Sequence, residues 1–272
     1  MSKAKDKRKD RKERKTASAR KQSEAHKGGL RLTTFHVPDQ VQLWKPAKKK
    51  IVDLIPYVAS NHPYVDAGEL TYERTFYVHA KVGPDEESRI CPKYTHGGEG
   101  RCPICEYRTK LGKDPDADEE MVKALKHKRR QLFLPYDHDD EEQGVQLWEY
   151  SHWNFGKHLE AYIEDSDEDE GYDIFHDPDD GFTLRLGFSQ ETYGSNKYFE
   201  SSSIRMLERK KAQIKKVHEL LEHGISLDDL LIIPSYDELY ALFNDEPVKK
   251  DKKKKDKKKD KKKKDKDDDV PF

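Results

Sequence analysis

The stretch CPKYTHGGEGRCPIC, residues 91–105, holds all three cysteines of the 272-residue chain. Cys102 and Cys105 have the two-residue spacing of a metal knuckle, in which both thiolates turn toward one ion. Cys91 offers a third thiolate from across a glycine-rich loop. An odd number of cysteines and the lack of a secretory signal argue against a disulfide. The spacing therefore predicts a structural zinc ion, whose tetrahedron one histidine must complete.

Two histidines lie near enough to be the fourth ligand. His79 belongs to the alternating run FYVHAKV, residues 76–82, which is typical of a strand. His96 lies inside the loop between Cys91 and Cys102. A ligand on a strand is held by the sheet, and a second partner can orient its ring. The residues by themselves favour His79 only slightly and leave His96 open.

The order His79…Cys91…Cys102-Pro-x-Cys105 resembles the single-stranded DNA-binding protein of T-even phages. The resemblance covers roughly residues 40–205, and its zinc constellation is the most specific part. In that family the strand histidine binds zinc, which implies His79 here, and the fold is an OB-fold that binds single strands without catalysis. The other matching positions are Thr95-His96-Gly97, Glu106-Tyr107, Trp148, Tyr150, Asn154 to Lys157, Leu159, Tyr162-Ile163, Gly187-Phe188, Tyr193 to Asn196 and Tyr198-Phe199.

The composition limits the class of protein. Hydrophobic residues make up 33% of the chain and charged residues 39%, so a good part of it cannot belong to a packed core. No apolar run approaches the length of a membrane span, and the basic N-terminus lacks an apolar segment. We expect neither a membrane protein nor a secreted one. Free cysteines in metal spacing fit the reducing cytoplasm, which is the host cytoplasm if the protein is viral.

The charges are segregated along the chain, although the net charge is only −1. Residues 1–27 hold twelve Lys or Arg and four Asp or Glu, and residues 248–272 hold fourteen Lys and seven Asp. The middle of the chain is therefore acidic. Its acidic segments, 137–142, 164–170 and 177–180, are expected to lie away from bound nucleic acid and to repel duplex DNA.

The hydrophobic pattern divides the chain into four parts. We expect a basic flexible arm at 1–27, a core at 28–205 with a zinc subdomain at about 71–112, a helical segment at 206–247, and a Lys-rich tether with an acidic tip at 248–272. Expected strands are 51–57, 71–82, 130–136, 145–150, 182–188 and 197–202, and expected helices are 119–128, 156–163, 204–221, 227–233 and 236–243. Periodicity alone supports a β-rich α+β fold. Short strands with interleaved aromatics fit an OB-fold barrel.

Binding of single strands requires cations that follow the phosphates and flat rings that stack on bases. The candidate DNA-binding residues combine both types around the predicted zinc site and strands. Trp153 and Tyr193, in polar surroundings, are the best stacking candidates, whereas Phe155 equally suits a core. The full set is Tyr107, Arg108, Lys110, Lys126, Lys128, Arg129, Arg130, Trp153, Phe155, Lys157, Tyr193, Lys197 and Tyr198.

The two ends predict partners. The ending Asp267-Asp268-Asp269-Val270-Pro271-Phe272 is similar to the C-terminal tip of bacterial single-stranded DNA-binding proteins, so we expect it to bind replication and recombination proteins. The Lys-rich tether before it departs from the T-even pattern. The basic cluster Arg11 to Thr16 resembles the cooperativity arm of the T-even family and predicts self-association on DNA. A general polyanion-binding arm fits it equally well.

These patterns predict a sequence-independent single-stranded DNA-binding protein of DNA replication, recombination and repair, with one structural zinc and no enzymatic activity. Two alternatives stay open. One is a zinc-containing nuclease or primase, and the other is a zinc-knuckle RNA-binding protein or transcription factor. Neither a nucleotide-binding glycine loop nor a nucleophile constellation is evident in the sequence.

Overall fold

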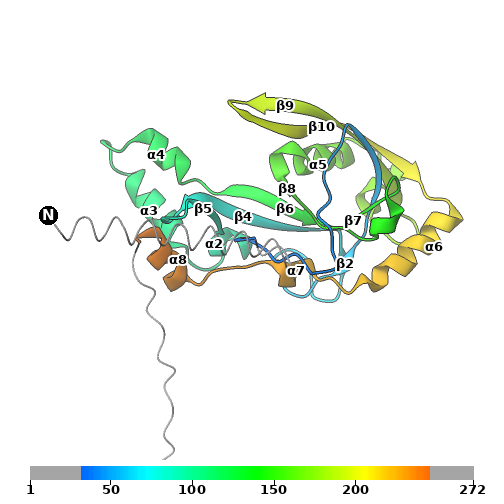
Figure 1. Ribbon diagram of the computed structural model, residues 1–272, viewed down its shortest axis with the longest axis horizontal. Coiled ribbons are helices and arrows are strands. Elements are labelled where there is room, and N and C mark those ends of the chain that lie inside the picture. Colours follow the sequence, from blue (N-terminus) through cyan, green and yellow to red (C-terminus); the bar gives the residue numbers. More distant parts are fainter. Residues whose placement is uncertain (1–31, 246–272) are drawn as a thin grey trace, which may run out of the picture.

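The computed structural model describes residues 32–245 (Figure 1). The predicted N-terminal arm and the predicted tether and tip lie outside these residues. Within them the chain forms a sheet-rich α+β fold, built on two four-stranded antiparallel sheets.

The first sheet has the strand order β5-β4-β6-β8, with β4 at Glu73–Val82, β5 at Glu87–Ile90, β6 at Lys128–Phe133 and β8 at Trp148–Ser151. Side chains alternate between its two faces. Phe76, Val78 and Leu132 belong to one hydrophobic core, while Tyr77 and Phe133 belong to two others. The two faces of this sheet therefore pack against different parts of the molecule.

The second sheet has the order β10-β9-β1-β7, with β1 at Lys49–Leu54, β7 at Pro135–Asp137, β9 at Phe182–Tyr193 and β10 at Asn196–Glu208. A two-stranded sheet pairs β2 (Tyr57–Val58) with β3 (Leu70–Thr71). Only Leu134 separates β6 from β7, and its carbonyl accepts a hydrogen bond from the Ile55 amide at 2.8 Å. The chain thus passes directly from one sheet into the other.

Strand pairing among the described residues does not close into a barrel. The α+β, β-rich expectation is confirmed at this level, and the expected OB-fold barrel is not established by the pairing. Between residues 32 and 245, no helix is long and apolar enough to cross a membrane.

Seven α-helices of the described part cover the sheets: α2 Pro92–Thr95, α3 Pro103–Leu111, α4 Glu119–Ala124, α5 Gly156–Glu164, α6 Lys211–Leu220, α7 Leu227–Leu230 and α8 Tyr236–Phe243. Short 3₁₀ turns lie at Glu141–Gln143, His152–Asn154, Glu168–Glu170, Tyr172–Ile174 and Leu221–His223. In Figure 1, α3, α4 and α8 gather at one end of the molecule, and α6 lies at the other.

Three hydrophobic clusters hold these layers together. The first joins Phe76 and Leu132 of the first sheet to Val217 of α6 and Leu227 of α7. The second fills the space between the two sheets and α5. The third surrounds Cys91 and Cys102 and includes Leu239 of α8. The C-terminal helices are therefore part of the packed structure.

The helix predicted over residues 204–221 is wrong in its first part. Residues 204–208 continue β10, where Ile204 pairs with Leu186 and Met206 pairs with Leu184 of β9. Their apolar side chains alternate with Arg205 and so suit a strand with one buried face. The helix predicted at 119–128 ends at Ala124, because Lys128 begins β6.

A buried ion pair connects the helical segment to the core. Arg74 of β4 and Asp228 of α7 lie 2.7 Å apart, and each side chain is only 1% exposed. The Asp228 carboxylate also accepts hydrogen bonds from the Tyr57 hydroxyl and from the amides of Ser60 and Asn61. These contacts fix α7 on the first sheet.

Candidate metal centre and nucleic-acid interface

Three short elements bring four metal ligands together. His79 lies on β4, Cys91 directly follows β5, and Cys102 and Cys105 lie at the start of α3. The Cys91 amide donates to the Tyr77 carbonyl at 2.7 Å, which continues the strand pairing up to the ligand. Pro103 occupies the first turn of α3, where a missing N–H costs nothing. The end of β5 and the start of α3 thus position the three cysteine ligands.

The four ligand atoms fit the geometry of one tetrahedral ion. They all lie within 4.8 Å of one another, and three of the four residues are buried. Cys91 Sγ and Cys105 Sγ are 3.6 Å apart, while His79 Nε2 lies 3.4 Å from Cys102 Sγ and 3.5 Å from Cys105 Sγ. Metal–ligand bonds of about 2.0–2.3 Å in a tetrahedron place ligand atoms about 3.5–3.8 Å apart. The cluster can therefore hold one metal ion.

The ring of His79 is oriented for metal binding. Its Nδ1 lies 3.0 Å from the Leu125 carbonyl oxygen, so Nδ1–H donates there and Nε2 keeps its lone pair for the metal. His96, the other candidate, is the exposed C-cap residue of α2 and does not belong to the cluster. The structure thus selects His79.

The close approach of the sulfurs changes their acidity. Hydrogen bonds from Cys105 and Cys91 hold the pKa of the Cys102 thiol far below its ordinary value, and hydrogen bonds with Cys102 and Cys91 raise the pKa of Cys105. Burial, followed by the nearby His79, lowers the pKa of His127 to about 4. His127 is therefore neutral at pH 7, so its ring adds no positive charge beside the metal ligands.

Helix α8 covers the outer side of the cluster. Leu239 and Phe243 pack against the cysteine-bearing segment, and Tyr236 donates to Glu106 of α3 at 2.8 Å. Arg101 completes this contact by pairing with Glu106 at 2.8 Å. Helix α8, outside the bounds of about 71–112 predicted for the zinc subdomain, therefore packs on the metal-binding cysteines.

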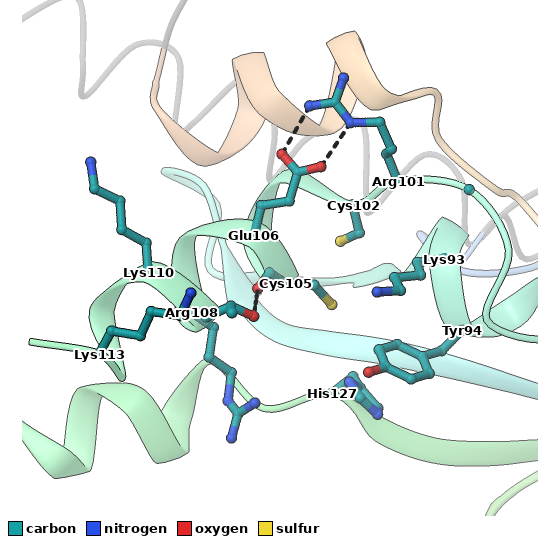
Figure 2. Close-up of a pocket in the computed structure, with 12 residues that line it drawn as sticks. Lys93, Tyr94, Arg101, Cys102, Cys105, Glu106, Arg108, Lys110, Lys113 and His127 are labelled. Carbon is teal, nitrogen blue, oxygen red and sulfur yellow. Dashed lines mark hydrogen bonds and ion pairs between the residues drawn. The ribbon is translucent and has the colours of Figure 1, made fainter.

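A basic hollow of about 440 Å³ opens next to the cluster (Figure 2). Five cationic side chains and only one carboxylate, that of Glu106, line this hollow. Figure 2 draws Tyr94 and His127 close together at one side of the hollow and Lys110 and Lys113 at another. Its lining residues are Lys93, Tyr94, Gly100, Arg101, Cys102, Cys105, Glu106, Arg108, Thr109, Lys110, Lys113 and His127. Arg108 and Lys110 were predicted; Lys93, Arg101 and Lys113 were not.

Three rings continue from the hollow onto the first sheet. The His127 and Tyr94 rings are 3.9 Å apart, and Tyr94 lies 5.7 Å from Tyr77 of β4. Tyr64 is 64% exposed and lies beside the loop that carries Gly97. A Cβ added to Gly97 would contact the Tyr64 ring at 3.7 Å. None of these residues was among the predicted DNA-binding residues. The alternation of Tyr77 with the buried Phe76 and Val78 is the signal that could have identified the first of them.

The same face of the sheet carries a cation and an exposed indole. Arg129 of β6 pairs with Tyr77 in register and donates to Glu160 at 2.8 Å, beside His152. Trp153, next in the chain, is 67% exposed, and the Lys157 ammonium lies 3.5 Å from its ring centroid. We name His127, Tyr94, Tyr77, Arg129, Trp153 and Lys157 the aromatic–cationic row.

The predicted basic run of β6 is divided between two faces. Arg130 and Lys128 pair in register with Phe76 and Val78, on the face opposite to Arg129. Arg130 is moreover bonded to Glu149 through its NH2 group at 2.6 Å. The exposed Lys126 precedes the strand. The four predicted cations therefore do not form one surface.

Phe155 was wrongly predicted to contact DNA. It is fully buried between Phe133 and Trp148 in the second cluster, so no base can stack on its ring. Tyr107 is 42% exposed but leans on Phe243 of α8. Its phenyl ring thus lies at a contact between helices.

The β9–β10 hairpin carries the remaining candidates. Tyr193 is 81% exposed at the turn, beside the exposed Lys197 and the half-buried Tyr198. Further along the hairpin, Glu200 of β10 lies 4.0 Å from the Lys157 ammonium of the aromatic–cationic row. Of the acidic segments, Asp137 is buried and accepts from Trp44 Nε1 and Lys50, so it serves packing rather than solvation.

Comparison with models of known protein families finds no match, and no curated protein sequence is significantly similar to this chain.

Proposed function

We propose that the protein binds single-stranded DNA without sequence preference and acts in DNA replication, recombination and repair by coating single strands. The aromatic–cationic row carries this proposal, because it brings four rings and two cations together along one face of the first sheet. Base stacking on such rings contributes about 1–3 kcal/mol per base and tolerates any base. The basic hollow beside the row supplies further phosphate contacts.

The metal in this proposal is zinc with a structural role. Three thiolates and one imidazole are the ligands that structural zinc sites use, and all four positions are filled by the protein. His79, Cys91, Cys102 and Cys105 would hold the ion and connect β4, β5 and α3. Bound zinc would fix the position of Tyr94, which is three residues after Cys91, and of His127.

The fold in this proposal is an OB-fold whose strands curl without complete closure. Two observations support it. The chain runs from β6 into β7 across a single residue, and β1 pairs with both β7 and β9. Helix α5 packs against both sheets through Leu159, and Phe155, directly before this helix, lies in the same cluster. The sequence resemblance to the T-even phage protein points to the same fold.

The proposed partners beyond DNA rest on sequence alone. Asp267 to Phe272 would bind replication and recombination proteins, and the N-terminal arm would contact a neighbouring copy on DNA. Both segments lie outside the described residues. A pull-down comparing the full chain with a chain lacking residues 267–272 tests the first of these; equal capture of the same proteins would leave the tip without this role.

A titration of the full chain with oligo-dT, mixed-sequence oligonucleotides, duplex DNA and RNA at two salt concentrations tests the proposed function. We expect similar affinity for all single-stranded DNA sequences, weaker binding of duplex, and affinity that falls as salt rises. Trp153→Ala should lower the affinity about 5- to 150-fold on every sequence, whereas Trp153→Phe should retain most of it. Equal affinity in all three proteins would reject the row as the binding site. Hydrolysis of the strand in Mg²⁺ would favour a nuclease.

A further inference from the structure

Three cations converge on the outer face of the second sheet, on the side away from its core. Leu184, Leu186 and Phe188 of β9 point into the core that packs on α5, so Arg185 and Gly187 between them face outward. Arg185 pairs in register with Arg205 of β10 and with Ile51 of β1. Lys49 of β1 and Ser203 of β10 both pair with Gly187.

These residues line a hollow of about 190 Å³, which we name the outer hollow. Its lining consists of Lys49, Arg185, Leu186, Gly187, Ser203 and Arg205, without a carboxylate. Lys49, Arg185 and Arg205 are all exposed. Among residues 32–245, none of the three cations has an ion-pair partner, in contrast to Arg74, Arg129, Arg130 and Arg209.

Residues that form the outer hollow are unfavourable for the stability of the sheet. Like charges directly opposite each other on neighbouring strands are destabilising, and Arg185 opposite Arg205 is such a pair. Glycine inside a strand also weakens it, and it often marks a site where a ligand approaches closely. A Cβ on Gly187 would meet Ser203 Oγ at 2.4 Å, so a side chain there would force the Ser203 hydroxyl to move.

A register shift opens the same place further. The pairing of β9 with β10 slips between Ser201 and Ser203, which leaves Ser202 unpaired next to the hollow. Its hydroxyl would lie 3.4 Å from a Cβ on Gly187. Bulges of this kind re-aim side chains next to binding sites. Three cations and the Ser203 hydroxyl thus line a space without a carboxylate, and the Ser202 hydroxyl lies next to it.

The spread of the cations identifies the ligand. Lys49 and Arg205 lie on the two strands that flank β9 and are offset by two residues along them, so their backbones are about 12 Å apart. That distance exceeds one phosphate group and suits neighbouring phosphates of one polyanion. We propose that the outer hollow binds the sugar–phosphate backbone of nucleic acid, as a second contact on the side of this sheet away from α5 and Trp153. This deepens the proposed function and rests on it.

The test compares Arg185→Gln/Arg205→Gln with a control that removes two exposed cations of α6, Lys211→Gln/Lys215→Gln, in the full chain. Each is titrated with oligo-dT of about 8 and about 30 nucleotides, lengths within and beyond the site of one single-strand-binding domain. We expect the short oligonucleotide to bind all proteins equally. For the long one, the hollow variant should lose affinity and its salt slope should fall by about 1.4, since each single-strand phosphate contact contributes about 0.7.

Two results would overturn this inference. The first is a long-oligonucleotide affinity and salt slope equal to those of the control variant. The second is a shift of the Arg185 and Arg205 Nε–Hε NMR signals with inorganic phosphate but not with the long oligonucleotide, which would assign the hollow to a free anion. Failure of the wild-type protein to bind the short oligonucleotide would instead reject the proposed function. The NMR titration with phosphate and long oligonucleotide still decides on the hollow in that case.

Discussion

His79 Nδ1 lies 3.0 Å from the carbonyl oxygen of Leu125, at the start of the segment that connects α4 to β6. The hydrogen bond fixes the tautomer that leaves Nε2 free, 3.4 Å from Cys102 Sγ. One ligand thereby links the strand, the knuckle and the loop that carries His127. The contacts of the His79 ring therefore determine which segments loss of the metal would affect.

Replacement of His79 should remove the metal, and replacement of His96 should not. His79→Ala leaves three thiolates and an open position, whereas His96 lies outside the cluster. Metal analysis of the purified variants measures this directly. We expect about one zinc per chain in the wild type and in His96→Ala, and little in His79→Ala. Zinc retained in His79→Ala and lost in His96→Ala would reverse the assignment.

Removal of the metal by a chelator should loosen α3 and α8 together and leave the rest of the fold in place. Leu239 of α8 packs in the same cluster as Cys91 and Cys102, whereas the other two clusters contain none of the ligands. Hydrogen exchange should therefore accelerate in α3 and α8 but not in β9. Equal acceleration throughout would indicate that the metal site stabilises the whole domain.

The metal site could be predicted from the sequence because ligand spacing is a local property. Cys102 and Cys105 belong to one helix turn, whereas the alternation of its strand favoured His79 only slightly over His96, and the family resemblance implied His79. The basic hollow could be predicted only in part, since Lys93, Arg101 and Lys113 approach it from separate segments. Such convergence depends on tertiary packing, which a pattern along the chain does not contain.

Two incorrect predictions have the same physical origin. Phe155 and Trp153 are both aromatic and close in sequence, but the turn at His152–Asn154 directs one into the core and leaves the other in solvent. Ile204 to Glu208 carry helix-compatible residues, but pairing with β9 determines their conformation. In both cases tertiary contacts overrode the local preference.

The buried pair Arg74–Asp228 should be sensitive to removal of one partner. Asp228→Ala would leave the Arg74 guanidinium uncompensated beneath α7 and should lower the free energy of unfolding by about 3–5 kcal/mol. Urea denaturation provides the measurement. The control is Lys123→Ala, which breaks exposed ion pairs on α4 and should change the free energy of unfolding by less than about 1 kcal/mol. Equal effects of the two variants would contradict the burial of the pair.

The pH dependence of stability should carry a contribution from His138. A hydrogen bond to the buried Asp53, 2.7 Å from Nε2, raises the pKa of His138 above its ordinary value of 6.5. Because the folded pKa is the higher one, this stabilisation is complete below pH 6.5 and is lost as the pH rises through the folded pKa.

His138→Gln separates this contribution from those of other histidines. Glutamine can donate to Asp53 but does not titrate. Burial lowers the pKa of His127 and His152 to about 4, so both titrate with the opposite sign in both proteins. The free energy of unfolding of the wild type, relative to that of His138→Gln, should fall by about 1 kcal/mol as the pH rises from 6 toward 9. A constant difference over this range would show that Asp53 does not hold the histidine protonated.

Arg129 and Arg130 are adjacent cations on opposite faces of β6, and only the first belongs to the aromatic–cationic row. If single strands bind along that row, Arg129→Gln should weaken oligo-dT binding, equally on all sequences, and lower the salt slope by about 0.7. Arg130→Gln removes the same charge from the other face and should leave both quantities nearly unchanged. Glu160→Gln provides a test of opposite sign, since Glu160 lies 2.8 Å from the Arg129 guanidinium and competes with a phosphate for it. Its affinity should rise. Equal losses in the two arginine variants, together with no gain in Glu160→Gln, would assign binding to long-range charge rather than to this face.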